Sequence, residues 1–335
     1  MHKIALLGAG RIGQVHARAI AAHPDCKLVA IADAVTEAAH KLAAQYGATV
    51  RTIDEIFDDR SIDAVLIATS TDTHANLIER ATAADKAVLC EKPVDLSLER
   101  ALQCQAAVAA TRKPVMIGFN RRFDAQFRAL KAALDRGEIG RAELLSITSF
   151  DPAPPPLAYI GGSGGLFRDM MIHDFDMACW IMGGAPATVI ATGSAIVDAQ
   201  IGAAGDVDTA VATLRWRDGR IAVIKNSRRA GYGYDQRVEL LGSQGLLSAK
   251  NVLENTLEKV TPEGTVTAKP VYFFLERYMR AYADEWTAFV EAFASGARMP
   301  VTLADGVAAL ACAEAATRAA RTGETVAITP AMLGT

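Results

Sequence analysis

The chain has 335 residues, of which 51% are apolar and 22% are charged, and its formal net charge at pH 7 is −3. This length and composition predict about two domains with substantial cores. The charge, without a long basic run, argues against nucleic acid or an anionic membrane as a partner, and no transmembrane stretch or signal peptide is indicated. Scattered cysteines without a Cys-x-x-Cys pair predict reduced thiols in the cytoplasm, with neither a disulfide framework nor a metal site. They are Cys26, Cys90, Cys104, Cys179 and Cys312.

The chain begins with an apolar strand pattern, KIALL, that runs into the glycine-rich turn GAGRIG. Gly8, Gly10 and Gly13 form a G-x-G-x-x-G pattern, and a helical pattern follows. In this fingerprint the first glycine allows a tight turn, the second lets a pyrophosphate approach the backbone, and the third lets the helix pack closely. The N–H groups of the helix N-terminus then face the phosphates. Arg11 and Ile12, between the glycines, belong to the predicted cofactor site.

A second strand pattern, KLVAIAD, ends at Asp33, 20 residues after Gly13. A carboxylate at this position can accept hydrogen bonds from the adenosine ribose hydroxyls. The alternative is a solvated aspartate at the end of a strand. The residues that follow, AVTEAA, contain no arginine, so a 2′-phosphate would be repelled by Asp33 and would meet no cation. We therefore predict NAD rather than NADP.

Strand and helix patterns go on alternating as far as residue 120. The runs AVLIAT, AVLCEKP and PVMIGFN are apolar enough to be strands buried on both faces, and the alternation predicts a doubly wound parallel sheet. Ligands bind such sheets beyond the carboxyl ends of the strands. Polar residues gather at those ends, and we predict that six of them contact the cofactor: Thr69, Ser70, Thr71, His74, Glu91 and Lys92.

Lys92 is the most informative of these residues. A lysine at the mouth of a buried strand can be desolvated, which makes its amine chemically useful. Pro93 next to it restricts the backbone and allows a cis peptide bond. The alternative is an exposed lysine before a proline that starts a helix, and spacing alone does not decide between the two.

Strand patterns dominate after residue 120. An amphipathic helix follows the arginines of NRRFD, and strand patterns then cover 142–150, 187–196, 208–227, 236–250 and 256–269. WRDGR and TPEGT are typical of hairpins, and two helices close the chain around 275–294 and 303–321. The chain is therefore predicted to be α/β: an N-terminal Rossmann domain over 1–119, then an α+β domain over 120–335 with a large, open, mostly antiparallel sheet. The last helix is free to pack back on the first domain.

The segment FRDMMIHDFDM places acidic residues and a histidine in an apolar helix pattern, predicted from about Leu166 to Met182. At 3.6 residues per turn, Asp169, His173 and Asp176 share one face, and Asp174 points elsewhere. Two alternatives stay open, a histidine satisfied within the core and a divalent metal site. The dinucleotide pattern of the first half argues against a metal. The proline-rich stretch before this helix, 151–165, is predicted to be a covering loop.

GAGRIG, Asp33, TSTDTH, EKP and the strand-rich second half together resemble the glucose-fructose oxidoreductase/inositol dehydrogenase (Gfo/Idh/MocA) family over essentially the whole chain. GFNRRFD, SFDPAPPP, GGLFRDMMIHDFDM and YGYDQRVE resemble the inositol 2-dehydrogenases of that family. The resemblance implies an NAD-dependent dehydrogenase of inositol catabolism that oxidises myo-inositol to 2-keto-myo-inositol. It also implies a homotetramer that assembles through the open sheet.

The resemblance further assigns residues. Lys92, Asp169 and His173 match the catalytic positions of the family, with His173 as the base. Asn120, Arg122 and Tyr234 are expected to bind the polyol with these three, and Asp176 lies in or beside the same pocket. Asn120 stands where many members have an apolar residue. A sugar (pyranose) dehydrogenase, a dehydrogenase of another inositol isomer and a non-catalytic NAD-binding regulator remain alternatives.

Overall fold

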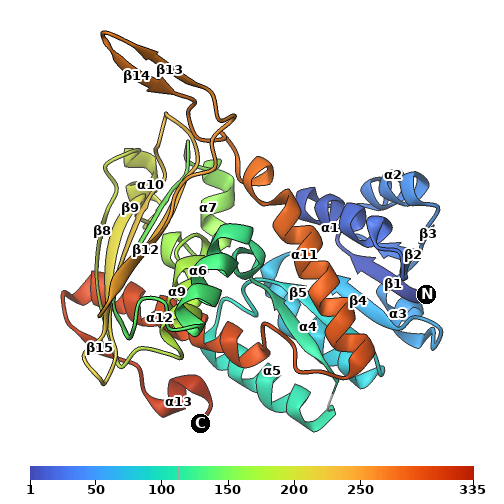
Figure 1. Cartoon of the computed structure of the whole chain (residues 1–335). Coiled ribbons are helices and arrows are strands. Elements are labelled where there is room, and N and C mark those ends of the chain that lie inside the picture. Colours follow the sequence, from blue (N-terminus) through green and yellow to red (C-terminus); the bar gives the residue numbers. More distant parts are fainter. Residues whose placement is uncertain (112) are drawn as a thin grey trace. The chain divides into compact units, whose positions relative to one another are not determined.

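The computed structural model describes residues 1–111 and 113–335, which divide into two compact units (Figure 1). The first unit comprises Met1–Phe123, Arg280–Leu310 and Pro330–Thr335, and the second comprises Asp124–Met279 and Ala311–Thr329. The first unit therefore contains segments from near the C-terminus as well as the N-terminal region.

The first unit is built on a six-stranded sheet with the strand order β3-β2-β1-β4-β5-β6, in which all neighbours are parallel. This is the strand order of dinucleotide-binding folds, so the predicted Rossmann sheet is confirmed. All four residues of β4 are buried, which explains their continuous apolar pattern. The strands are β1 His2–Leu7, β2 Cys26–Ala32, β3 Thr49–Val50, β4 Ala64–Ile67, β5 Ala87–Glu91 and β6 Val115–Gly118.

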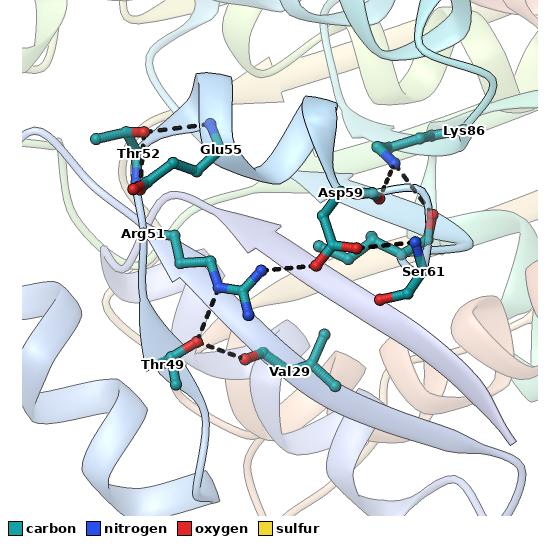
Figure 2. A network of polar contacts seen from close by, with 9 residues as sticks. Val29, Thr49, Arg51, Thr52, Glu55, Asp59, Ser61 and Lys86 are labelled. Atoms are coloured by element: carbon teal, nitrogen blue, oxygen red, sulfur yellow. Dashed lines mark hydrogen bonds and ion pairs between the residues drawn. The ribbon is translucent and has the colours of Figure 1, made fainter.

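Helices alternate with these strands. Helix α1 follows the glycine turn and buries Val15, Ala19 and Ile20. Helix α3 starts with a capping box between Thr52 and Glu55, drawn in Figure 2, which satisfies backbone N–H groups of its first turn. The helices are α1 Arg11–Ala22, α2 Thr36–Tyr46, α3 Ile53–Asp58, α4 Thr71–Ala83, α5 Leu98–Thr111 and the 3-10 helix η1 Asn120–Phe123.

A polar network holds the loops that precede β4 and β5 (Figure 2). Asp59 accepts hydrogen bonds from Arg51 Nη1 at 2.7 Å and from Ser61 N at 2.8 Å. Lys86 is buried, and its Nζ donates to the carbonyl oxygens of Asp59 and Ile62. Burial lowers the pKa of Lys86. Because these loops lead into the amino ends of the strands, the network is structural and lies away from the carboxyl edge.

The second unit contains a seven-stranded sheet with the strand order β12-β11-β7-β10-β9-β8-β15. Only β7 and β10 pair in parallel, so the predicted open, mostly antiparallel sheet is confirmed. WRDGR joins β9 to β10, and TPEGT joins β13 to β14, as predicted. The β13–β14 hairpin extends away from the large sheet (Figure 1). The strands are β7 Ala142–Phe150, β8 Thr188–Ser194, β9 Thr209–Arg215, β10 Ile221–Ser227, β11 Asp235–Gly242, β12 Gly245–Ala249, β13 Glu258–Thr261, β14 Gly264–Thr267 and β15 Val326–Ala327.

The two faces of the seven-stranded sheet differ sharply. One row of paired residues, Leu240, Leu145, Ala222 and Leu214, is fully buried. The adjacent row points to the opposite face because side chains alternate along each strand. This outer row consists of Leu246, Leu241, Leu144 and Ile221, which are 57%, 43%, 41% and 37% exposed. The outer face of the sheet therefore carries a continuous apolar stripe.

The segment 166–182 is not one helix, so the predicted continuous helix is wrong. Helix α8, Leu166–Asp169, ends before Met170, and α9, Ile172–Met182, begins after Met171. At the break, Met171 N bonds the carbonyl of Leu166 five residues earlier, and His173 N bonds that of Met170 three residues earlier. The regular i→i−4 ladder is thus interrupted, and helical spacing no longer relates Asp169 to His173.

The predicted covering loop 151–165 contains a short helix, α7, Leu157–Ser163. The two C-terminal helices are present as predicted. In the part of the chain that the structure describes, no helix is both long enough and apolar enough to cross a membrane. The remaining helices are α6 Ala125–Asp135, α10 Ala199–Ala203, α11 Phe274–Ser295, α12 Leu303–Thr322 and α13 Pro330–Leu333.

Candidate functional site

The glycine turn after β1 has the backbone that the fingerprint requires. Gly8 has φ +103°, and a Cβ there would overlap the carbonyl of Ala68. A Cβ on Gly13 would overlap the carbonyl of Gly8, so the third glycine lets α1 pack directly on the turn. Around Gly10, by contrast, nothing lies within 4 Å of where a Cβ would be. Gly10 is exposed at the N-terminus of α1, without a side-chain cap. The turn therefore fits a pyrophosphate.

Asp33, just beyond β2, is partly exposed and holds this turn in place. One carboxylate oxygen accepts a hydrogen bond from Ala9 N at 2.6 Å, and the other accepts one from Val35 N at 2.7 Å. A carboxylate oxygen has more than one acceptor site, so these bonds leave capacity for ribose hydroxyls. Binding of the ribose by Asp33 stays a prediction.

The ends of β4 and β5 lie side by side, because Ile67 pairs with Cys90 in a parallel ladder. The residues predicted to contact the cofactor follow these two ends. Ser70 is exposed, whereas His74 is only 1% exposed. Four of the other predicted cofactor residues are partly exposed: Thr69, Thr71, Glu91 and Lys92. On the glycine turn, Arg11 is exposed and Ile12 is partly exposed.

The turn around Lys92 is tied on both sides, and the Lys92–Pro93 peptide bond is cis. Glu91 Oε1 lies 2.7 Å from His16 Nε2, and the carbonyl oxygen of Pro93 lies 2.8 Å from His74 Nδ1. The sequence analysis did not identify His16 as a residue of the site. Its position three residues after Gly13, the last glycine of the fingerprint, was the one feature of the sequence that could have indicated it.

Asn120 and Arg122 follow β6 in η1, and both are buried. Arg122 Nη2 lies 3.2 Å from an oxygen of Asp305, and its Nη1 donates to the carbonyl of Pro300 at 3.4 Å. Burial alone would raise the pKa of Asp305, but the charge of Arg122 and hydrogen bonds from Thr302 together lower it. Arg122 therefore has a structural partner, Asp305, that the sequence did not indicate.

In the second unit, Asp169 ends α8 and accepts from two side chains. Tyr159 Oη in α7 donates to Asp169 Oδ1 at 2.9 Å, and Arg228 Nη2, just beyond β10, lies 3.5 Å from Oδ2. Arg228 is 2% exposed. His173 lies in the first turn of α9 and is partly exposed. The sequence analysis singled out neither Tyr159, which lies in the predicted covering loop, nor Arg228.

The two other aspartates of this segment are buried in α9. Asp174 accepts hydrogen bonds from Ser149 Oγ at 2.6 Å and Asn226 Nδ2 at 2.8 Å. These donors lie on β7 and β10, so Asp174 anchors α9 to the sheet. Asp176 is 1% exposed, and its predicted place beside the substrate stays a prediction.

Tyr234, also predicted to bind the substrate, is 6% exposed and packs edge-on against Tyr278 with ring centroids 6.0 Å apart. Its neighbour Tyr232 is the more exposed of the two tyrosines, and its hydroxyl donates to Asp235 Oδ2 at 2.7 Å. Burial and the hydrogen bond to Asp235 raise the pKa of Tyr232 to about 12.

Two family models match the chain. Residues 2–119 match an oxidoreductase family described as an NAD-binding Rossmann fold, and residues 127–248 match the GFO/IDH/MocA C-terminal domain. The chain belongs to the Gfo/Idh/MocA oxidoreductase family. As a member of that family it has an NAD-binding Rossmann domain, so the predicted family, fold and cofactor are confirmed.

Individual members of the Gfo/Idh/MocA family are similar along the whole chain. The inositol 2-dehydrogenase of Rhizobium meliloti is 50% identical over 317 residues, covering 94% of this chain and 96% of that protein. The crystal structure of a myo-inositol dehydrogenase from Corynebacterium glutamicum matches with a TM-score of 0.94 at 44% identity, covering 98% and 99% of the two chains. That of a scyllo-inositol dehydrogenase from Lactobacillus casei, with bound NAD(H) and scyllo-inositol, has a TM-score of 0.90 at 30% identity and the same coverage.

Proposed function

We propose that this protein oxidises one ring hydroxyl of a cyclitol, converting myo-inositol to 2-keto-myo-inositol. The observation that carries the proposal is the 50% identity to an inositol 2-dehydrogenase over 94% of the chain. NAD, when bound, accepts the hydride at its nicotinamide ring.

In the proposed reaction, the substrate carbon loses hydrogen with its electron pair and the hydroxyl loses its proton, so the product is a ketone. His173 takes the hydroxyl proton as the general base, a role worth roughly 10²–10⁴-fold in rate. Lys92 donates a hydrogen bond to the same oxygen and stabilises the negative charge that develops there. Asp169 orients the imidazole of His173 and stabilises its cationic form.

The surroundings of Asp169 support its role. A base must be oriented within a few tenths of an ångström, which requires that the orienting group be held in turn. The phenol of Tyr159 and the guanidinium of Arg228 hold the two oxygens of Asp169 from separate elements. Arg228, being 2% exposed, provides a fixed positive charge beside the carboxylate.

Oxidation of scyllo-inositol is the second candidate. One specific observation favours it: a similar structure is that of a scyllo-inositol dehydrogenase holding scyllo-inositol and NAD(H). The myo and scyllo isomers differ at one hydroxyl, so the same base and lysine would serve both. A pyranose presents a similar ring of hydroxyls and forms a third class of substrate.

We further propose that the protein is a cytoplasmic homotetramer of inositol catabolism. The five cysteines are free thiols, which suits a reducing compartment. The stripe of Leu246, Leu241, Leu144 and Ile221 is an apolar surface of the kind that subunits bury against each other.

A substrate panel tests the proposed reaction. Purified protein would be incubated with NAD or NADP and, separately, myo-inositol, scyllo-inositol, chiro-inositol, glucose and xylose, and the absorbance of the reduced nicotinamide would be followed. We expect the highest kcat/KM with NAD and myo-inositol. A higher value with glucose or xylose would replace the cyclitol assignment, and no turnover with any alcohol would favour a non-catalytic regulator.

A further inference from the structure

Two buried histidines flank Lys92 in the first unit. His16, from α1, contacts the residue before the lysine, and His74, from α4, contacts the residue after it. The two histidines are 0% and 1% exposed. His74 is predicted to contact the cofactor, but neither histidine has a role in the proton transfer described above, and the two come from different helices.

His16 fixes the side chain of Glu91. Its Nε2 lies 2.7 Å from Glu91 Oε1, and the ring of Tyr282 packs edge-on against the imidazole with centroids 5.4 Å apart. Gly118 on β6 leaves room for the side chain of Glu91, because a Cβ there would lie 3.3 Å from Glu91 Cδ. The carboxylate of Glu91 is therefore tied to α1 by His16 and lies close to β6.

His74 fixes the main chain at Pro93. Its Nδ1 lies 2.8 Å from the carbonyl oxygen of Pro93, and its Nε2 lies 3.2 Å from that of Thr69. A neutral imidazole donates through only one nitrogen. Burial lowers the pKa of His74 and favours the neutral ring, so the shorter contact assigns the proton to Nδ1. The donated hydrogen bond then goes to Pro93.

We propose that His16 and His74 are positioning residues that clamp the two neighbours of Lys92, the side chain of Glu91 and the main chain at Pro93, and thereby aim the lysine amine at the reacting oxygen. The proposal rests on the role given to Lys92 in the proposed function. Misplacement of a reacting group by about 1 Å can cost about 10²-fold in rate, so a clamp of this kind matters for turnover. It also links the lysine to α1 and to the turn after β4, the elements predicted to bind NAD.

Two substitutions at residue 74 separate this role from simple packing. The amide nitrogen of His74→Asn replaces Nδ1 and can still donate to Pro93, whereas that of His74→Gln replaces Nε2 and faces Thr69. We expect His74→Asn to retain at least about tenfold more of kcat than His74→Gln. A residue that only fills space would make the two variants equal in kcat, and that result would overturn the proposal.

A matched pair tests residue 16. His16→Gln keeps a donor at the position of Nε2 toward Glu91, and His16→Leu removes it. We expect His16→Leu to lower kcat about tenfold to 100-fold relative to His16→Gln, with the KM for NAD changed by less than about threefold. A fall in NAD affinity without a fall in kcat would assign His16 to cofactor binding and contradict the clamp.

The decisive measurement combines His16→Leu with Lys92→Ala. If the histidine acts through the lysine, adding His16→Leu to Lys92→Ala should change the residual kcat by less than about twofold, whereas a full second loss would overturn the proposal. Melting temperatures and fluorescence titration with NAD show which variants are folded. If His16→Leu does not fold, the comparison of His74→Asn with His74→Gln tests the proposal instead. Turnover of the wild-type protein in the same assay separates the proposed function from the proposed role of the two histidines. If the wild type shows no turnover, the proposed function is refuted. If the wild type turns over and the histidine variants have the same kcat, the positioning role of the histidines is refuted.

Discussion

The carboxylate of Asp33 accepts a hydrogen bond from the backbone N–H of Ala9 at 2.6 Å. This bond joins the end of β2 to the glycine turn after β1, two elements that are 24 residues apart. Asp33 therefore has two separable properties. Its oxygens support the turn, and its negative charge is predicted to repel the 2′-phosphate of NADP.

Substitutions at Asp33 should separate these properties. Asp33→Asn removes the charge but retains one oxygen that can accept from Ala9, whereas Asp33→Ala removes both. We expect both variants to lose discrimination against NADP by about tenfold, since one unfavourable charge contact is worth roughly 1–2 kcal/mol in a partly exposed site. Only Asp33→Ala should also raise the KM for NAD strongly.

The measurement is the ratio of kcat/KM for NAD to that for NADP in each variant. Glu37→Gln, a neutral substitution at an acidic residue in the first turn of α2, is the control for general loss of charge. An unchanged ratio in Asp33→Asn would remove the charge of Asp33 from cofactor selection.

His173 should be essential for turnover but not for NAD binding. We expect His173→Ala to lower kcat by about 10²–10⁴-fold, the usual contribution of a positioned acid–base group, with NAD affinity within about twofold of wild type. The measurement pairs steady-state kinetics with fluorescence titration of NAD. His40→Ala is the matched control, because His40 is an exposed histidine on α2. Near-normal kcat in His173→Ala would identify another group as the base.

The pair between Arg122 and Asp305 should make stability depend on pH. The pKa of Asp305 is lowered in the folded protein, so the unfolded chain binds the proton more readily. Its ionised form therefore stabilises the fold above the unfolded pKa of about 3.9. The stabilisation by the ionised Asp305 is lost as the pH falls below the unfolded pKa and then through the lower pKa that Asp305 has in the folded protein.

We accordingly expect Asp305→Asn to lower the unfolding free energy at pH 7 by about 1–3 kcal/mol, as for removal of one partner of a largely buried ion pair. The difference from wild type should shrink below about pH 4 as the wild-type carboxylate is protonated. Urea unfolding at several pH values measures both effects. A difference that stays constant from pH 7 down to pH 3 would mean that the ion pair does not contribute.

Much of this fold could be predicted because its signals are local. The apolar run of β4 and the glycines after β1 each specify one element, and WRDGR specifies one hairpin. The break at Met170–Met171 had no such signal, since neither residue is a glycine or a proline. Both methionines are buried. The backbone N–H of Leu166 donates a hydrogen bond to the carboxylate of Asp206, 40 residues away in the chain. Tertiary contacts therefore determine the geometry of the break.

The difference between local signals and contacts that form only in the folded chain also applies to the candidate site. Asp169 and Lys92 could be proposed as site residues from short motifs, but the side chains that contact Asp169 and Glu91, the residue before Lys92, could not be predicted. Tyr159 and Arg228 lie 10 and 59 positions from Asp169 in the chain, and His16 lies 75 positions from Glu91. Such pairs form only after the chain folds, and periodicity in one sequence carries no information about them.

The outer row of the seven-stranded sheet should determine assembly. Leu144 lies between Leu241 and Ile221 in that row, so a lysine there would place a charge in the middle of an apolar interface. Burying an unpaired charge is strongly unfavourable, whereas the same lysine on a free subunit would be solvated. We therefore expect Leu144→Lys to dissociate the assembly while shifting the melting temperature of the separated subunit by only a few degrees.

Light scattering coupled to size-exclusion chromatography measures the mass of each variant. Ile196→Lys is the control, because Ile196 is 65% exposed and lies beyond the end of β8. We expect this control to retain the wild-type mass of four subunits, and Leu144→Lys to show a smaller species. A monomeric wild-type protein, or a Leu144→Lys variant with the wild-type mass, would mean that this stripe is not the subunit interface. The exposed apolar side chains of β7, β10, β11 and β12 would then require a different partner, since a stripe of this extent is unusual on a surface that stays in contact with water.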